Sequence, residues 1–347
     1  MKNILIISLL LTASITPLQA DWKAELADIH QQLSALQENA SGLDDGQRLE
    51  AYYQLSYDAT MLESPSFASY LGDPRGAGRL DDISLQAQQR QQAFEKASLE
   101  LISSLDRGVL SQAERVNYDL LLDSLQTRVA GHEFPDHLLV MNQMGGPQQD
   151  LTRLLAIMPN DRVAQLENQV SRLEAYPEYV DQAIALMREG MKQGVTPPAI
   201  TLRDVPAQIR AQMVDDAAQS PLLKGFVEVP ETVDPLQAET LRKRAETAYR
   251  KAVVPALERL LEFTENQYLP AARDSIAARD LPNGVEWYRH NVAVRTTTKL
   301  TPQQIHDIGL AEVQRIRAEM DEVIKSTDFA GSFEEFLHFL RTDPQFY

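Results

Sequence analysis

Apolar residues recur along this chain at spacings of three and four, and this period constrains the fold more than any other feature of the sequence. In residues 22–38, for example, Leu26, Ile29 and Leu33 fall on one face of a helix. Proline and glycine stand between the periodic segments, whereas alternating runs of valine, isoleucine and threonine of strand length are almost absent. The sequence therefore predicts an all-α fold, a multi-helix bundle with short connections.

Capping residues give boundaries for individual helices. Ser111 is followed three residues later by Glu114, the pattern of a capping box, and Thr301 begins a similar pattern. Asp234 precedes Pro235, a pair that is typical of a helix start. We expect helices over residues 22–38, 47–61, 84–105, 112–130, 160–190, 235–268, 302–325 and 332–342.

Three stretches interrupt the helical pattern. Residues 64–79 are predicted to be a loop, and residues 136–159 an irregular segment. The helix that resumes at residue 160 is expected to pause at Pro177, and the helix after Pro235 to kink at Pro255. Residues 196–229 contain several prolines but are expected to be an ordered crossover, because their apolar residues require burial: Ile200, Leu202, Val205, Ile209 and Leu222.

The N-terminus has the organisation of a secretory signal peptide. Lys2 supplies a positive charge, residues 4–15 form an apolar run, and Ala20 ends a short segment suited to cleavage. The apolar run is too short to span a bilayer comfortably. We therefore expect residues 1–20 to be removed, and residues 21–347 to form a helical domain that is periplasmic or secreted and has no membrane anchor.

Composition limits the partners and the chemistry. The chain has 33 basic and 50 acidic residues, a net charge of −17 at pH 7, so nucleic acid and anionic membranes are poor partners. It has no cysteine, which excludes disulfides, thiol catalysis, thiolate metal sites and lipid attachment at a cleavage-site cysteine. Stability must therefore come from a buried core.

No complete catalytic or metal-binding pattern is found. His132 and Glu133 resemble the start of a zinc motif, but Pro135 prevents a single helical face, and His137 lies five residues from His132. A serine nucleophile elbow and a phosphate-binding glycine loop are also missing. The sequence predicts no catalytic residue, no metal ligand and no cofactor site within this chain.

Two polar segments are candidates for substrate binding. Asn142, Gln143 and Gln148 surround a glycine turn, where their amides could reach a ligand or could instead satisfy loop carbonyls. The second candidate segment combines charged, aromatic and imidazole groups: Glu286, Tyr288 and His290. Such groups can line a cleft, although tryptophan and tyrosine at adjacent helical positions are also typical of a core residue beside a rim residue.

Four segments resemble a known bacterial family, the "domain of unknown function 885": residues 142–150, 190–198, 300–313 and 339–347. The resemblance covers nearly all of residues 21–347. It implies an all-helical, zinc-metallopeptidase-like protein, often exported, whose zinc motif lies in a C-terminal half that has no counterpart here. It implies that this chain is the N-terminal half of such a fold, and that zinc belongs only to the full-length protein.

The C-terminal residues support the same expectation. Asp343 and Pro344 repeat the helix start at Asp234 and Pro235, yet only three residues follow. We therefore expect a chain truncated at its C-terminus, whose partners are a peptide substrate and the missing C-terminal half. Its predicted function is to form the substrate cleft of an exported peptidase-like protein. A non-catalytic periplasmic binding or scaffold protein is the alternative.

We predict that purified residues 21–347 hold no stoichiometric zinc, because the histidines lack ligand spacing on any one helix. Elemental analysis measures this directly. One tightly held zinc per chain, lost when His132 or His137 is replaced, would contradict the prediction.

Overall fold

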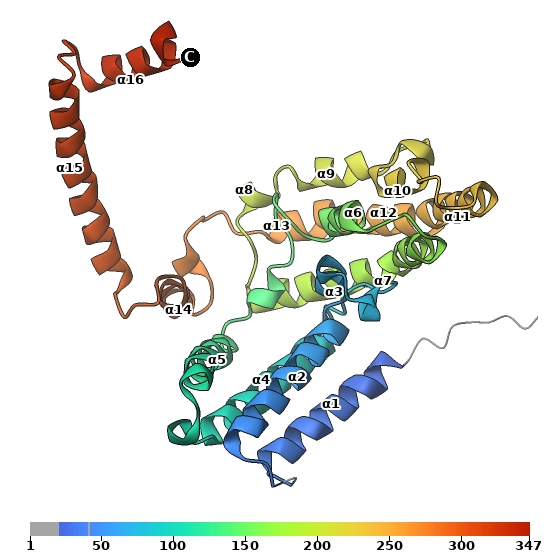
Figure 1. The fold of residues 1–347 in the computed structure, drawn as a ribbon. Helices are drawn as coiled ribbons and strands as arrows, with labels where there is room; N and C mark the ends of the chain where they lie inside the picture. Colours follow the sequence, from blue (N-terminus) through green and yellow to red (C-terminus); the bar gives the residue numbers. More distant parts are fainter. Residues whose placement is uncertain (1–20, 41) are drawn as a thin grey trace, which may run out of the picture. The chain divides into compact units, whose positions relative to one another are not determined.

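The computed structural model describes residues 21–40 and 42–347, so the expected signal peptide at 1–20 lies outside the described residues. The described residues form helices and turns, with two isolated backbone bridges and no strand, which confirms the all-α prediction (Figure 1). The chain divides into two compact units, Met1–Ile276 and Ala277–Tyr347, and each is described by itself. Within the described residues, no helix is both long and apolar enough to cross a membrane.

The first unit begins with a group of long helices that pack through their apolar faces: α1 (Trp22–Gln37), α2 (Asp45–Glu63), α4 (Leu85–Ser104) and α5 (Gln112–Gly131). Their shared core includes Leu33, Tyr52 and Leu101, each almost completely buried. Ser111 and Glu114 form the predicted capping box at the start of α5. The period of three and four thus gave both these helices and their buried faces.

A second core in the same unit surrounds the 31-residue helix α7 (Val163–Gln193). It is completed by α6 (Pro147–Ile157), α8 (Ala199–Leu202), α9 (Val205–Gln212), α10 (Lys224–Val227), α11 (Pro235–Ala248), α12 (Val254–Phe263) and α13 (Leu269–Ala271). Short 3-10 turns lie between the helices of both units or follow the last helix: Pro74–Gly76, Arg107–Val109, Asp136–Leu138, Ala217–Gln219, Pro221–Leu223, Ala278–Asp280 and Pro344–Phe346. Residues 196–229 are therefore an ordered crossover, as predicted, but Ile200 is exposed.

Three differences from the predicted helix boundaries occur at prolines. Residues 64–79 contain the helix α3 (Pro65–Leu71), and residues 136–159 contain α6, because Pro65 and Pro147 occupy first helical positions, where the missing N–H is not needed. Pro177 does not interrupt α7. Tyr176 directly before it and Val180 three residues after it are buried on the inner face of the helix, so tertiary packing offsets the lost backbone hydrogen bond.

The helical run from α11 to α13 changes its hydrogen bonding at two π-helical turns, Tyr249–Val253 and Thr264–Tyr268. The first lies directly before Pro255, which lacks the N–H that a regular helix requires. The hydroxyl of Tyr249 donates to the carbonyl of Gln212 at 2.9 Å and accepts from the N–H of Val214 at 2.7 Å. The π-helical turn Tyr249–Val253 therefore ends two residues before Pro255, where the sequence predicted a kink.

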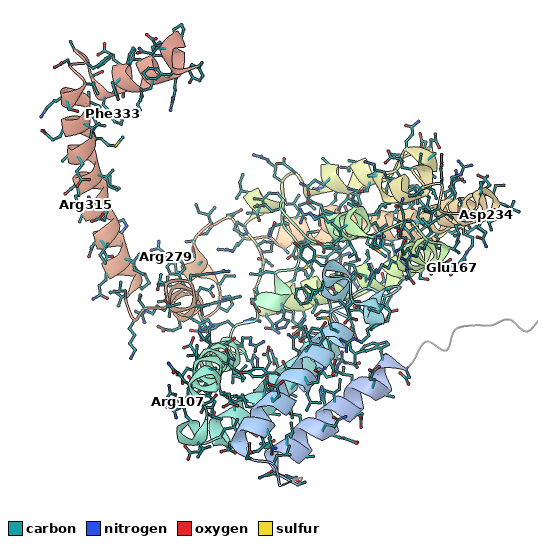
Figure 2. All side chains as sticks on the ribbon, viewed as in Figure 1. Arg107, Glu167, Asp234, Arg279, Arg315 and Phe333 are labelled. Atoms are coloured by element: carbon teal, nitrogen blue, oxygen red, sulfur yellow. The ribbon has the colours of Figure 1, made fainter. Side chains whose placement is uncertain are left out.

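The second unit contains α14 (Gly284–Thr296), α15 (Pro302–Ser326) and α16 (Phe333–Thr342). Thr301 forms the predicted capping box of α15. Aromatic rings from the α15–α16 connection and from α16 contact one another, with Phe329 at 5.2 Å from both Phe336 and Phe339. Arg317 lies 3.6 Å from the ring of Phe333. These contacts join α15 to α16, the two helices that carry the labelled residues Arg315 and Phe333 in Figure 2.

The apolar stripe of α15 is exposed. Val313 is 68% exposed and Val323 is 60% exposed, and the stripe also contains Ile308, Ile316 and Met320. Charged neighbours pair along the helix itself, as Arg315 does with Glu312 at 2.7 Å. Within the second unit this face of α15 is therefore mostly exposed.

We predict that this stripe binds a hydrophobic dye, because a contiguous exposed apolar patch is uncommon on a soluble monomer. The double substitution Val313→Gln and Val323→Gln should lower the fluorescence of bound anilinonaphthalene sulfonate. Val109→Gln is the control, since Val109 is also 68% exposed but lies in a 3-10 turn of the first unit. Equal fluorescence from all three proteins would contradict the prediction.

Candidate functional site

The first predicted binding segment covers the loop that leads to α6 and the first turn of that helix. The Asn142 side chain accepts hydrogen bonds from the backbone of Met144 at 2.7 Å and Gly145 at 3.2 Å. Gln148 is buried, and its amide donates to the Asn142 carbonyl at 2.9 Å. The carbonyl of Gln143 accepts from the side chain of Gln208 at 2.9 Å. These amides hold the loop together, and their role in substrate binding stays a prediction.

The second predicted segment lies on α14 in the second unit. Glu286 pairs with Arg289 at 2.6 Å. Trp287 is buried within its unit and Tyr288 is half exposed, the core-and-rim arrangement that the sequence left open. Tyr288 borders a cavity of about 540 Å³, and His290 lies two residues further along the helix. The six predicted residues are thus divided between the two units, and the binding role of these three also stays a prediction.

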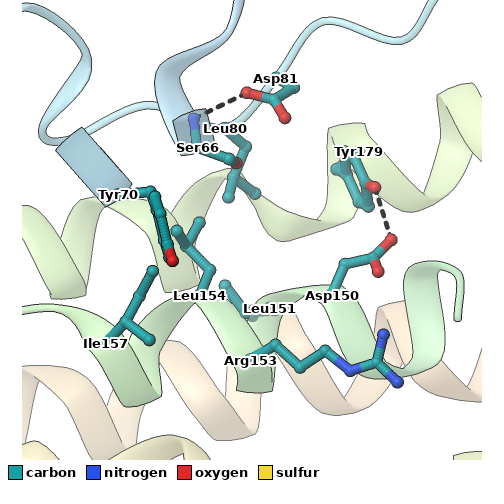
Figure 3. Close-up of a pocket in the computed structure, with 10 residues that line it drawn as sticks. All are labelled: Ser66, Tyr70, Leu80, Asp81, Asp150, Leu151, Arg153, Leu154, Ile157 and Tyr179. Carbon is teal, nitrogen blue, oxygen red and sulfur yellow. Dashed lines mark hydrogen bonds between the residues drawn. The ribbon is translucent and has the colours of Figure 1, made fainter. Parts of the chain in front are cut away.

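A pocket of about 480 Å³ in the first unit combines apolar and charged groups (Figure 3). The helices α3, α6 and α7 and the segment before α4 supply its lining: Ser66, Tyr70, Leu80, Asp81, Asp150, Leu151, Arg153, Leu154, Ile157 and Tyr179. A second cavity of about 390 Å³ shares Leu80, Asp81 and Tyr179 with it. The two cavities are therefore neighbours, with these three side chains between them.

One wall of the pocket is apolar because α6 is amphipathic. Leu151 and Leu154 are buried on the face that α6 turns toward the interior, and Ile157 is 51% exposed. Tyr70, on α3, is 72% exposed. Ile157 and Tyr70 therefore form the accessible part of the wall, while the two leucines form its buried part (Figure 3).

Two carboxyl groups enter the pocket from different segments. Asp150 accepts a hydrogen bond from the Tyr179 hydroxyl at 2.8 Å. Burial and the charge of Asp150 raise the pKa of the Tyr179 phenol above its usual range. Asp81 accepts from the backbone N–H of Ser66 at 2.8 Å. Burial raises the pKa of Asp81, and the charge of Asp150 raises it further, while Ser66 and Arg172 oppose the shift.

Arg172 fixes the segment that carries Ser66 and Asp81. Its guanidinium is completely buried and donates to the carbonyl of Gly76 at 3.0 Å and the hydroxyl of Ser69 at 2.5 Å. Burial lowers its pKa to about 10, so it stays charged at neutral pH. Gly76 itself packs directly against Pro65 of α3, and a Cβ at this position would lie 2.6 Å from the Cα of Pro65. Glycine therefore permits the two backbone segments to approach closely.

Arg153 supplies a positive charge at the edge of the same pocket. Its guanidinium donates to the Met144 carbonyl and to the side-chain oxygen of Gln149. Neither bond neutralises its charge, and the described residues provide it with no ion pair. The pocket therefore offers two carboxylates, one guanidinium and an apolar wall, a set of groups that suits a ligand with charged ends and an apolar side chain.

Comparison with known proteins identifies the family. Residues 65–347 match the family described as "Bacterial protein of unknown function (DUF885)". The chain belongs to the DUF885 family. No curated protein has a sequence that matches it. A solved structure with a similar fold is the "putative lipoprotein" from Colwellia psychrerythraea, with a TM-score of 0.72 and 19% identity over 93% of this chain. The DUF885 chain spans only 55% of that protein.

The residues that shape the pocket of this DUF885 chain were not among those predicted from the sequence. Arg172, Tyr176 and Tyr179 stand at spacings of four and three, so they share one face of α7. A charged residue among large aromatic residues on a buried helix face is a signal that could have been used. Asp81 gave no such signal, because it lies in an irregular segment between helices.

His132 and His137, for which the sequence predicts no zinc site, are not part of the pocket lining. His132 lies at the C-terminal end of α5, and its Nε2 atom is 2.6 Å from Oε2 of Glu95 on α4. Burial lowers the pKa of His137. In the part of the chain that the structure describes, no three histidine or acidic side chains are grouped as metal ligands would be.

We predict that Arg172→Met destabilises the DUF885 chain by about 3 kcal/mol, because it removes three buried hydrogen bonds of the guanidinium, to Ser69, Gly76 and Pro65. Urea unfolding followed by circular dichroism measures the change. Lys192→Met is the control on the same helix, since its exposed pair with Glu189 contributes little. Equal midpoints for the two variants would contradict the structural role of Arg172.

Proposed function

We propose that this chain forms the substrate cleft of an exported, zinc-metallopeptidase-like protein, and that the 480 Å³ pocket of the first unit binds short peptides. The mixed lining of this pocket is the observation that carries the proposal. A short peptide has an ammonium, a carboxylate and side chains that are often apolar, and the pocket has a complementary group for each of them.

The chemistry would be divided between two parts of a longer polypeptide. We propose that the zinc ligands and the general base lie beyond residue 347, where the bound metal would activate a water for hydrolysis. The residues of this chain would bind and orient the peptide. Such positioning contributes to catalysis because it fixes the reacting bond relative to the nucleophile.

Several contacts suit the pocket to this role. Its lining comes from α3, α6 and α7, and buried contacts of Arg172 and Tyr176 hold these helices together. The hydroxyl of Tyr176 donates to the carbonyl of Pro147 at 2.7 Å, which joins α7 to the first turn of α6. A pocket built on such joined elements is largely formed before its ligand binds, which lowers the entropic cost of binding.

The expected result of Tyr70→Ala is about fivefold weaker binding of the tripeptide Leu-Ala-Gly, because the variant loses about 1 kcal/mol of apolar contact. Isothermal titration calorimetry of the purified protein measures the affinity. Phe67→Ala is the matched control, since Phe67 is an exposed aromatic residue of α3 that is not part of the pocket lining. An equal loss in both variants, or no binding by the unaltered protein, would overturn the proposal.

A further inference from the structure

We infer that the pocket selects peptides with a free amino terminus, and that the terminal ammonium binds between Asp81 and Asp150 while the first side chain lies on the apolar wall. This inference rests on the proposed function and adds a substrate class and an orientation to it. The acceptor atoms, the charge of the two aspartates and the position of the apolar wall support it.

The charges of Arg79 and Arg172 partly offset that of Asp81, but neither arginine forms an ion pair with it. Asp81 and Asp150 lie close enough for the charge of one to affect the ionisation of the other. The described residues provide neither carboxylate with an ion pair. Arg172 attracts Asp81, but its guanidinium is committed to the carbonyl of Gly76 and the hydroxyl of Ser69. A bound cation would therefore relieve the repulsion between the carboxylates.

The remaining acceptor positions suit an ammonium group. An ionised carboxylate has about four lone-pair positions, and an ammonium has three donors. One oxygen of Asp81 accepts from Ser66, and the two oxygens of Asp150 accept from Tyr179 at 2.8 Å and from the Gly146 N–H at 3.4 Å. Free positions remain on both carboxylates, and each retained bond holds its carboxylate in a fixed orientation.

The apolar wall determines which ammonium fits. Asp150 is in the first turn of α6, and Leu151, Leu154 and Ile157 follow it along the same helix. A ligand whose ammonium binds at Asp150 therefore has an apolar surface within the same pocket (Figure 3). An N-terminal residue with a branched aliphatic side chain carries both groups on one carbon atom. Arg153 at the pocket edge lies near Asp150 in sequence and disfavours a second cation there.

The test compares Leu-Ala-Gly with its N-acetylated form, by isothermal titration calorimetry on the purified protein. Acetylation removes the positive charge and keeps the apolar side chain, so we expect the affinity to fall about tenfold or more. Isoamylamine, which has the ammonium and the branched chain without a peptide, should also bind about tenfold more weakly than Leu-Ala-Gly. An amine that binds as well as the peptide would overturn the peptide assignment.

Isosteric variants test the two carboxylates. In Asp150→Asn and Asp81→Asn the new amide oxygen can still accept from Tyr179 or Ser66, but the negative charge is lost. The ratio of the two affinities, free peptide over acetylated peptide, should fall from about ten toward one in both variants. A purely structural role would weaken both ligands equally and leave this ratio unchanged.

Asp181→Asn is the control, because Asp181 is an exposed aspartate of α7 that is not part of the pocket lining. It makes the same change of charge and should leave the ratio at its original value. Equal affinity of free and acetylated peptide for the unaltered protein would overturn the inference and leave peptide binding standing. Failure of both peptides to bind would overturn the inference and the proposed function together.

Discussion

The geometry of the pocket depends on the buried guanidinium of Arg172. A charge without water is costly unless its donors are paired. Here Nη2 binds the backbone and the Ser69 hydroxyl of the segment that carries Ser66 and Asp81, Nη1 binds the sulfur of Met158, and Nε has no partner. The same bonds add a second donor to the carbonyls of Gly76 and Pro65, which also accept from the Arg79 N–H and the Ser69 hydroxyl. Arg172 therefore stabilises both its own charge and the chain around it, and it holds α3 against α7.

The pocket keeps two like charges close together, which is locally unfavourable. Tyr179 and Ser66 hold the two carboxylates through neutral donors, and no ion pair of the described residues cancels the charge of either one. Conflicts of this kind are expected mainly at functional sites, because elsewhere each residue tends to agree with the fold. This property distinguishes the pocket from the loop around Asn142 and Gln148, where the amides satisfy one another and the backbone.

The exposed stripe of α15 shows how far a helical period can be interpreted. Ile308, Ile316 and Val323 share one face, since the spacing alone determines which side chains lie on it. The spacing does not determine what covers the face. In the described residues the stripe is exposed, whereas the equally periodic face of α1, with Leu26 and Leu33, is buried against α2 and α4.

The sequence by itself determined most of the long helices, because side-chain period and capping are local: the box at Ser111 and the pair Asp234–Pro235 begin helices where predicted. Local signals failed where distant packing decided the outcome, as at Pro177, where the buried side chains of Tyr176 and Val180 keep α7 continuous. The pocket was decided by tertiary structure alone. Asp81 and Asp150 are 69 positions apart, and only the packing of α3 and α6 on α7 brings their carboxyl groups into one cavity.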